Sequence, residues 1–262
     1  MITSASNGKI KMIQNLRKKS KFRREEKLFI IEGIRLFEET PKHLLKEVYV
    51  SENAENMQKD RLIGVKYEVV SDNIFASVSD TQTPQGILAV VHQPECSPEK
   101  ILSAENPLLL ILEDLQDPGN LGTILRTAEG AGVTGILMTK GCVDIYNPKV
   151  VRSTMGSIYR MPFAYLENEE EFFRIFRQLK EKNIVSYGAA LMESQDYDMY
   201  SYEKGTAFVI GNEGNGLTKT ALSLCEKHVK IPMCGQLESL NAAVASSVLM
   251  YEAFRQRRRK PL

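Results

Sequence analysis

Two short polar segments near the end of the chain carry the residue types that a ligand-binding turn requires. The first covers residues 211–216 (GNEGNG), the second covers residues 231–235 (IPMCG), and each directly follows an apolar run. Glycine permits positive φ angles and a close approach of the backbone to a ligand, and the Asn and Glu side chains supply hydrogen bonds beside the turn. Because ligands of α/β proteins bind at the carboxyl ends of strands, the two segments predict a ligand site.

A third segment of interest is the turn at residues 117–120 (DPGN), which lies between an apolar run at 108–112 and an amphipathic stretch. Apolar residues recur in that stretch at helical spacing, which predicts a helix over residues 120–131. Asn120 is a natural N-cap for this helix, and capping alone would explain it. Arg126 is either a surface residue of the helix or, because the helix starts at a strand end, part of the same ligand site.

Strands and helices alternate through most of the chain, which predicts an α/β fold with a mostly parallel sheet. Residues 107–262 contain predicted strands at 108–112, 136–139, 163–166, 184–190, 208–210 and 228–231, and predicted helices at 120–131, 147–157, 169–182, 217–226 and 241–257. Residues 1–92 form a smaller α/β domain with predicted helices at 10–19 and 33–39 and strands at 28–32, 47–50, 66–70 and 86–91. Residues 93–106 begin with a proline-containing, aperiodic stretch and are interpreted as a linker.

Composition and spacing exclude several classes of protein. The chain has 262 residues, of which 43% are apolar and 26% are charged, as in a globular protein with a hydrophobic core. It has no apolar run long enough to span a membrane, and its first residues lack the apolar segment of a secretory signal. The four cysteines form no CxxC pair and no zinc-type spacing. We therefore expect a cytoplasmic protein with reduced thiols, no bound metal and no membrane contact.

Residues 130–135 (GAGVTG) have the letters of a dinucleotide-binding fingerprint but not its context. The fingerprint requires a strand before it and a helix after it, whereas here a predicted helix precedes and a predicted strand follows. The chain also lacks a P-loop motif. An ordinary nucleotide-dependent enzyme of the doubly wound type is therefore disfavoured.

Basic residues gather at both ends of a chain whose net charge is only +1. The first 27 residues include Lys18, Lys19, Arg23 and Arg24, and a second basic cluster covers residues 255–260. Such clusters favour a polyanion such as RNA as partner, although solvated surface charge is the alternative. We expect Lys18, Lys19, Arg23 and Arg24 to contact phosphates, with the second cluster as a weaker candidate.

Taken together, the motifs resemble the SpoU (TrmH-like) branch of the SPOUT RNA ribose 2′-O-methyltransferases. They are LQDPGNLGTILRTA at 115–128, IGNEGNGL at 210–217, IPM at 231–233 and ESLNAAVA at 238–245, with NPKVVRSTMGS at 147–157 as a further match. The resemblance covers about residues 107–255. Residues 1–92 resemble the L30e-like substrate-binding domain of this branch, with TPQGILA at 83–89 as a typical phrase.

The resemblance implies a catalytic domain with a deep C-terminal trefoil knot, although true knots are rare. It also implies S-adenosylmethionine as cofactor and a homodimer. The apolar residues of the helix at 241–257 fit either of two roles equally well, a part of the dimer interface or packing in the core. By motif position, the residues that bind the cofactor would be Gly211, Ile231, Leu240, Met233 and Ala190. The catalytic set would be Arg126, Asn120, Glu213, Ser239 and Asn241.

These positions suggest roles in methyl transfer to a ribose 2′-hydroxyl, a group that RNA has and DNA lacks. In the family Arg126 is the proposed general base, but a side chain that stays protonated in proteins suits phosphate binding better. Asn120 would orient Arg126 or the ribose, and Glu213 would hold backbone N–H groups. Ser239 either caps the last helix or contacts the substrate, and Asn241 would tie the loops together.

The implied activity is 2′-O-methylation of RNA, with 23S rRNA favoured by the L30e-like domain. A tRNA 2′-O-methyltransferase is one alternative, and a non-catalytic RNA-binding protein on the same scaffold is another. The full polar set argues against the non-catalytic alternative. Some members of this branch confer self-resistance to a ribosome-targeting antibiotic, and the target nucleotide stays open.

Overall fold

The computed structural model describes residues 1–191 and 193–258, which form two compact units. The N-terminal unit consists of Met1–Glu95 and Asp144–Tyr159, and the C-terminal unit contains the remainder of the chain. The segment Asp144–Tyr159 lies within the region expected to form the catalytic domain, yet it packs with the N-terminal unit. The predicted domain boundaries at residues 92 and 107 place this segment in the C-terminal domain, whereas the structure places it in the N-terminal unit.

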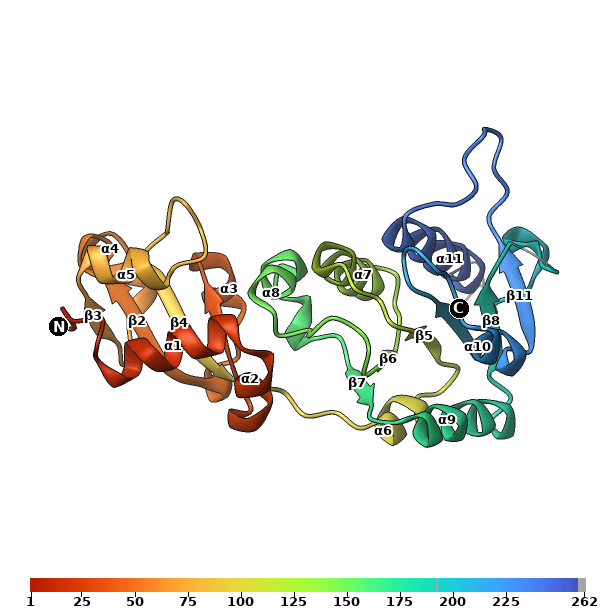
Figure 1. Cartoon of the computed structure of the whole chain (residues 1–262), viewed down its shortest axis with the longest axis horizontal. Helices are drawn as coiled ribbons and strands as arrows, with labels where there is room; N and C mark the ends of the chain where they lie inside the picture. Colours follow the sequence, from red (N-terminus) through yellow and green to blue (C-terminus); the bar gives the residue numbers. More distant parts are fainter. Residues whose placement is uncertain (192, 259–262) are drawn as a thin grey trace. The chain divides into compact units, whose positions relative to one another are not determined.

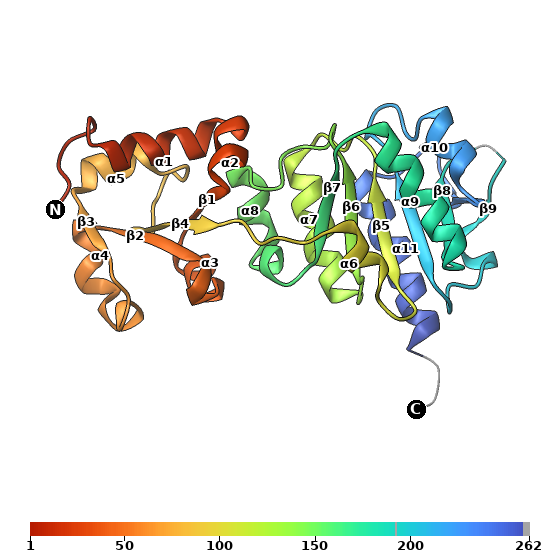
Figure 2. The same cartoon turned by 90° about the horizontal axis from the view of Figure 1, so that it is seen from below.

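The N-terminal unit is built on a four-stranded sheet in the order β1-β4-β2-β3. Helices α1, α2 and α5 lie on one face, and α3 and α4 lie on the other (Figure 2). Buried residues of α1, namely Ile10, Ile13 and Leu16, join strand residues in its core. In chain order the elements are α1 (Gly8–Lys18), α2 (Ser20–Glu26), β1 (Leu28–Glu32), α3 (Ile34–Glu39), η1 (Lys42–Leu44), β2 (Leu45–Ser51), α4 (Glu52–Met57), η2 (Lys59–Leu62), β3 (Glu68–Val70), α5 (Asp72–Val78), β4 (Ile87–His92), α8 (Pro148–Thr154) and η3 (Ser157–Tyr159).

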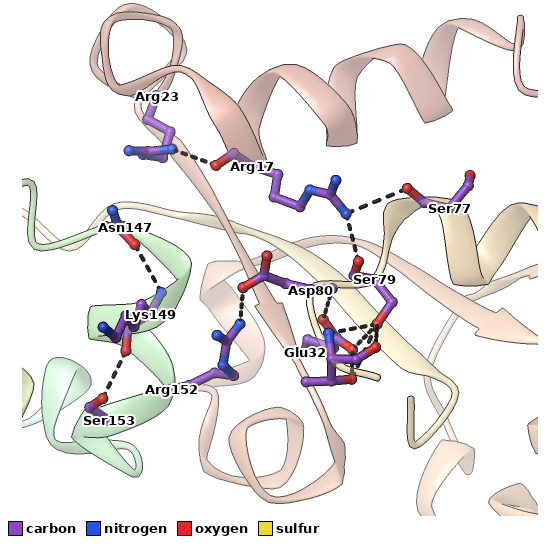
Figure 3. A network of polar contacts seen from close by, with 11 residues as sticks. Arg17, Arg23, Glu32, Ser77, Ser79, Asp80, Asn147, Lys149, Arg152 and Ser153 are labelled. Carbon is purple, nitrogen blue, oxygen red and sulfur yellow. Dashed lines mark hydrogen bonds and ion pairs between the residues drawn. The ribbon is translucent and has the colours of Figure 1, made fainter. Parts of the chain in front are cut away.

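Polar contacts fasten the segment Asp144–Tyr159 to the rest of the N-terminal unit. The Arg23 guanidinium donates to Asp144 Oδ2 through Nε at 2.8 Å and through Nη2 at 2.5 Å. Arg152 on α8 pairs with Asp80, whose neighbours Ser79 and Thr81 donate hydroxyl hydrogen bonds to Glu32. Figure 3 shows the Arg152–Asp80 pair beside the Glu32 carboxylate.

The C-terminal unit is a seven-stranded sheet in the order β7-β6-β5-β10-β8-β11-β9, and its paired strands are parallel. Helices α7 and α11 cover one face, and α6, α9 and α10 cover the other (Figure 1). The predicted α/β class with a mostly parallel sheet and a smaller N-terminal domain is therefore confirmed. In chain order the elements are α6 (Pro98–Leu102), β5 (Leu108–Leu112), α7 (Pro118–Gly130), β6 (Gly135–Thr139), β7 (Phe163–Leu166), α9 (Glu169–Glu181), β8 (Val185–Ala189), β9 (Gln195–Asp196), η4 (Tyr197–Met199), β10 (Thr206–Ile210), α10 (Lys219–Leu224), β11 (Lys227–Lys230) and α11 (Ala242–Arg257).

The expected linker contains a short helix that belongs to the core. Ile101 and Leu102 of α6 are buried against the sheet. A Cβ atom at Gly135 would lie 2.4 Å from Ile101 Cγ2, so only glycine lets this helix pack there. The last glycine of GAGVTG is thus explained by packing, in agreement with the rejected dinucleotide site. None of the described helices combines the length and apolarity that crossing a membrane requires.

Candidate active site

Three loops of the C-terminal unit follow strands β5, β10 and β11 at the same edge of the sheet. They cover residues 113–117, 211–218 and 231–241. Because the three strands run parallel, their carboxyl ends share this edge. The polar segments identified in the sequence are therefore brought together in space.

Glu213 joins the second loop to the first. Its carboxylate accepts hydrogen bonds from the backbone N–H groups of Asp117 at 2.9 Å and Gln116 at 3.1 Å. It also accepts from Asn120 Nδ2 at 3.0 Å. The expected role of Glu213, holding backbone N–H groups, has direct geometric support.

Asn120 and Asn241 extend this connection to the third loop. Asn241 Nδ2 donates to Asn120 Oδ1 at 2.9 Å. Asn241 Oδ1 accepts from the N–H groups of Ala243 and Val244 and so caps α11. Glu213 and Asn241 are thus joined through Asn120 in the first turn of α7, and Glu213 also holds the N–H groups of the first loop, so all three loops are connected. Ser239, whose alternative role was that of helix cap, does not cap α11 because Asn241 does.

The start of α7 corrects one expectation. Asp117, not Asn120, is the N-cap, and its side chain accepts from Asn120 N–H at 2.8 Å. Pro118 occupies the first turn, where its fixed φ and missing N–H suit a helix start. The Asp-Pro pair in the sequence was the signal for this boundary. Moving the cap to Asp117 leaves the Asn120 amide free to bridge Glu213 and Asn241.

Arg126 lies further along α7, and its side chain is exposed. Within residues 1–191 and 193–258, no hydrogen bond or ion pair holds its guanidinium. The structure does not place Arg126 in contact with the Glu213–Asn120–Asn241 chain. Its charge is therefore free for an anionic ligand.

A cavity of about 770 Å³ opens between the second and third loops. Gly211, Ile231, Leu240 and Ala190, all expected to bind a cofactor, line it together with Glu213 and Ser239. Met233, expected in the same set, is not among the lining residues. The other lining residues are Ala189, Leu191, Glu193, Ile210, Asn212, Gly214, Asn215, Gly216, Leu217, Lys219, Leu222, Ser223, His228, Val229, Lys230, Glu238, Ala242, Ala245 and Leu249.

The second loop, residues 211–218, is called the glycine loop, and two backbone hydrogen bonds close it. Asn212 N–H donates to Gly216 O at 3.1 Å, and Gly216 N–H donates to Asn212 O at 2.9 Å. A Cβ atom at Gly211 would lie 2.1 Å from the carbonyl carbon of Gly216, and Gly216 itself has a φ of +67°. The close backbone contact requires glycine at Gly211, and the left-handed φ favours glycine at Gly216.

Opposing effects act on the pKa of Glu213. Partial burial of the exposed side chain disfavours the ionised form, but the hydrogen bonds from Asn120, Gln116 and Asp117 favour it more, so the pKa lies below its ordinary value of 4.5. Because the folded state lowers this pKa, the charged carboxylate stabilises the fold at neutral pH. That contribution is present above the ordinary pKa and is lost as pH falls through the lowered one.

We expect Glu213→Gln to reduce the free energy of unfolding by on the order of 1 kcal/mol at pH 7, because a charged acceptor of several donors is removed from an exposed position. The difference between wild type and variant should stay constant from neutral pH to about pH 5 and shrink only below the ordinary pKa. Denaturant unfolding of both proteins across this range measures it. A difference that already shrinks near pH 6 would contradict the assignment.

The expected RNA-binding residues of the N-terminal unit divide into two groups. Lys18, Lys19 and Arg24 are exposed. Arg23, by contrast, has a side chain that is only 3% exposed, is paired with Asp144, and donates to Leu16 O at 2.6 Å. The expectation for Arg23 is therefore corrected, because its guanidinium is used inside the unit.

The C-terminal basic cluster is largely occupied by internal contacts. Arg257 donates to four backbone carbonyls, those of Tyr202, Asn106, Pro107 and Lys204, and burial lowers its pKa. Arg255 is paired with Glu252. Arg259 and Lys260 lie outside the described residues. Within residues 1–191 and 193–258, no group of three or more His, Cys, Asp or Glu side chains is arranged to hold a metal ion.

Comparison with known families identifies the C-terminal part of the chain. The SpoU rRNA methylase family matches residues 107–251, which include the three loops and α7. The chain belongs to the SpoU rRNA methylase family. Residues 7–89 of this SpoU methylase match a second family, the MRM3-like substrate binding domain.

Relatives align along nearly the whole length of this SpoU methylase. It is 35% identical to the 23S rRNA (guanosine(2553)-2′-O)-methyltransferase of Bacillus subtilis, over 95% of this chain and 97% of that protein. It is 32% identical to the human mitochondrial rRNA methyltransferase 3, over 95% of this chain and 73% of that protein. The AdoMet complex of the SpoU methyltransferase AviRb from Streptomyces viridochromogenes superimposes with a TM-score of 0.85 at 26% identity, covering 96% and 99% of the two chains.

The cavity suits S-adenosylmethionine, the cofactor of this family. Its volume of about 770 Å³ lies within the usual range for small-molecule sites. Apolar lining residues such as Ile231, Leu240 and Leu249 would pack against an adenine ring, while Glu193 and Glu238 offer acceptors for hydroxyl or ammonium groups. A Cβ atom at Gly216 would meet nothing within 4 Å, so the glycine loop leaves open space beside its backbone. This SpoU methylase is an S-adenosylmethionine-dependent RNA 2′-O-methyltransferase.

Proposed function

We propose that the chain methylates a ribose 2′-hydroxyl of 23S rRNA. The observation that carries the proposal is the hydrogen-bonded chain Glu213–Asn120–Asn241, which joins the three loops beside a cavity suited to the cofactor. The curated relative from Bacillus subtilis, whose name assigns it to 23S rRNA, supports this substrate. The match of residues 7–89 to the MRM3-like substrate binding domain supports a separate substrate-binding unit beside the catalytic one. Such a substrate is consistent with action in the cytoplasm.

In this mechanism the cofactor supplies an electrophilic methyl group on a sulfonium. The protein's part is to hold the ribose hydroxyl in line with that methyl group, because alignment accounts for much of the rate of such a displacement. The chain Glu213–Asn120–Asn241 keeps the three loops in one arrangement. Asn120 would thereby be positioned to orient the ribose.

Arg126 would bind the phosphate beside the reacting ribose. A fixed positive charge near the 2′-hydroxyl lowers the pKa of that hydroxyl, which helps its proton to leave. Direct proton abstraction by Arg126 is less favourable because the reference pKa of arginine is about 12.5–13.8. Water or a phosphate oxygen would then take the proton. Ser239, which lines the cavity, would contact the ribose or phosphate.

We further infer a homodimer. Val244 and Tyr251 of α11 are apolar or aromatic side chains that remain 48% exposed, and Leu237 of the third loop is 71% exposed. A second copy of the chain would cover these groups from water. Sedimentation of the full chain at micromolar concentration tests this, and a monomer throughout would contradict it.

Labelled S-adenosylmethionine offered with separated 23S rRNA and tRNA tests the proposed activity. Label in 23S rRNA that disappears when the ribose 2′-hydroxyl is replaced by a 2′-deoxy position at the mapped site supports the proposal. Label in tRNA alone would favour the tRNA alternative. Tight RNA binding without cofactor binding would favour the non-catalytic protein.

We expect the triple variant Lys18→Gln, Lys19→Gln and Arg24→Gln to weaken rRNA binding and to flatten its salt dependence. Each lost phosphate contact should reduce the slope of log affinity against log salt by about 0.7–0.9. Removing residues 1–27 is not a suitable test, because α1 supplies part of the core.

The control for this experiment is a second triple variant, Lys42→Gln, Lys59→Gln and Lys66→Gln. These lysines are also exposed in the N-terminal unit, so the net charge changes by the same amount. Filter binding of 23S rRNA fragments at several salt concentrations measures both. An equal slope change in the two triple variants would argue for a general charge effect instead of a specific surface.

A further inference from the structure

Glu113 is a buried carboxylate that has no part in the mechanism above. It directly follows β5, and the residue is only 7% exposed. Its backbone N–H donates to Ile210 O at 2.8 Å, which continues the pairing of β5 with β10. Burying a carboxylate is unfavourable unless donors compensate for the lost water. The donors around Glu113 therefore indicate what it holds.

Both carboxylate oxygens of Glu113 are used by Thr218. The Thr218 N–H donates to Oε2 at 2.9 Å, and its hydroxyl donates to Oε1 at 2.7 Å. The same hydroxyl oxygen accepts from Ala221 N–H at 3.0 Å, because Thr218 is the N-cap of α10. Thr218 is thus held by the strand end on one side and by the helix on the other.

Glu113 and its neighbour Asp114 together hold both ends of the glycine loop. At the start of the loop, Asn212 Nδ2 donates to Asp114 O at 2.9 Å. At the end of the loop, Thr218 donates twice to the Glu113 carboxylate. Between these points the loop lines the cavity, and α10 continues the wall with Lys219, Leu222 and Ser223.

We infer that Glu113 is a positioning residue that acts through Thr218. It holds the glycine loop and the start of α10 in the conformation that binds S-adenosylmethionine. This inference rests on the proposed function, because it concerns the cofactor cavity of the same site. An ionised glutamate offers acceptors on both oxygens, whereas a glutamine side chain offers only one acceptor oxygen.

The test is the affinity for S-adenosylmethionine of the full chain, measured by calorimetry without RNA. Thr218→Val keeps the shape of the side chain and removes the hydroxyl, and we expect it to weaken binding about tenfold, because a hydrogen bond to a charged group is lost. Glu113→Gln should weaken binding similarly. The affinity of the double variant should fall by less than the product of the two single effects, because the two substitutions remove the same Glu113–Thr218 contact.

Two further variants separate positioning from folding. Thr218→Ser retains the hydroxyl and should bind within about threefold of wild type, since it can still cap the helix and reach Glu113. Thr220→Val lies on the exposed side of α10 and should bind like wild type. Thermal unfolding of every variant shows whether a change in affinity accompanies a loss of stability.

Wild-type affinity in Thr218→Val and Glu113→Gln, with only the unfolding temperature lowered, would overturn the inference and leave a structural role. If Thr218→Val does not fold, the comparison of Glu113→Gln with wild type decides in the same way. Absence of binding by the wild-type chain would overturn the proposed function itself, and the two failures are thereby distinguished.

Discussion

Replacing Arg126 with alanine is expected to reduce methyl transfer to 23S rRNA by about 10²–10⁴-fold, the range in which a charged group acts on proton removal and developing charge. The affinity for S-adenosylmethionine should stay within about twofold of wild type, because Arg126 is not among the residues that line the cavity. Single-turnover transfer of labelled methyl groups measures the first quantity, and calorimetry measures the second.

Two companion variants make the Arg126 result specific. Arg177→Ala removes an exposed arginine from α9, on the opposite face of the sheet, and should transfer methyl groups like wild type. Arg126→Lys keeps the positive charge but not the planar guanidinium, so it should retain part of the activity if Arg126 acts as a cation. Full activity of Arg126→Ala would remove this residue from the mechanism.

The second large effect is expected in the N-terminal unit, where Asp144→Ala should destabilise the fold by about 3–5 kcal/mol. The Asp144 carboxylate is the charged partner of Arg23, and both side chains are nearly enclosed, with exposed fractions of 13% and 3%. Without Asp144, the Arg23 guanidinium stays buried, and within the described part of the chain only the Leu16 and Arg17 carbonyl oxygens accept from it. A buried charge without a counter-charge is strongly unfavourable.

Asp80→Ala is the matched control, because Asp80 also pairs with an arginine of the N-terminal unit. That pair is 31% and 38% exposed, so its loss should cost below about 1 kcal/mol. Hydrogen exchange in peptides from β1 and α8 reports the stability of this unit separately from the other. Equal losses in the two variants would contradict the importance of burial at Arg23.

The sequence was sufficient for the parts of the fold that local patterns encode. Apolar runs located the buried strands of the parallel sheet, and spacing of three and four located α7. The polar positions of the glycine loop were also visible, because few other contexts place Gly, Asn and Glu together after a buried strand. The Thr218 cap and the Asp117-Pro118 helix start are likewise encoded by standard local signals.

Partnerships between distant residues were not accessible in this way. Arg23 was grouped with exposed basic neighbours, since a charge cluster does not reveal which member points inward. Its counter-charge Asp144 lies 121 residues away in the sequence. Asp144 belongs to a segment that was expected in the catalytic domain but packs with the N-terminal unit. Asn120 was interpreted as a helix cap for the same reason, because its partners Glu213 and Asn241 belong to other loops.

By itself the sequence determined the main strands and helices of the parallel sheet, the positions of the polar turns and the motifs that place the chain among SpoU methylases. It missed the shorter elements α2, α4, α5, α6 and β9. Only the tertiary structure decided that Glu213, Asn120 and Asn241 form one connection and that Glu113 holds Thr218 across 105 residues. The physical reason is that periodicity reports which side of an element is buried, whereas strand order decides which loop ends meet. That order, with β10 placed between β5 and β8, results from packing across the whole sheet.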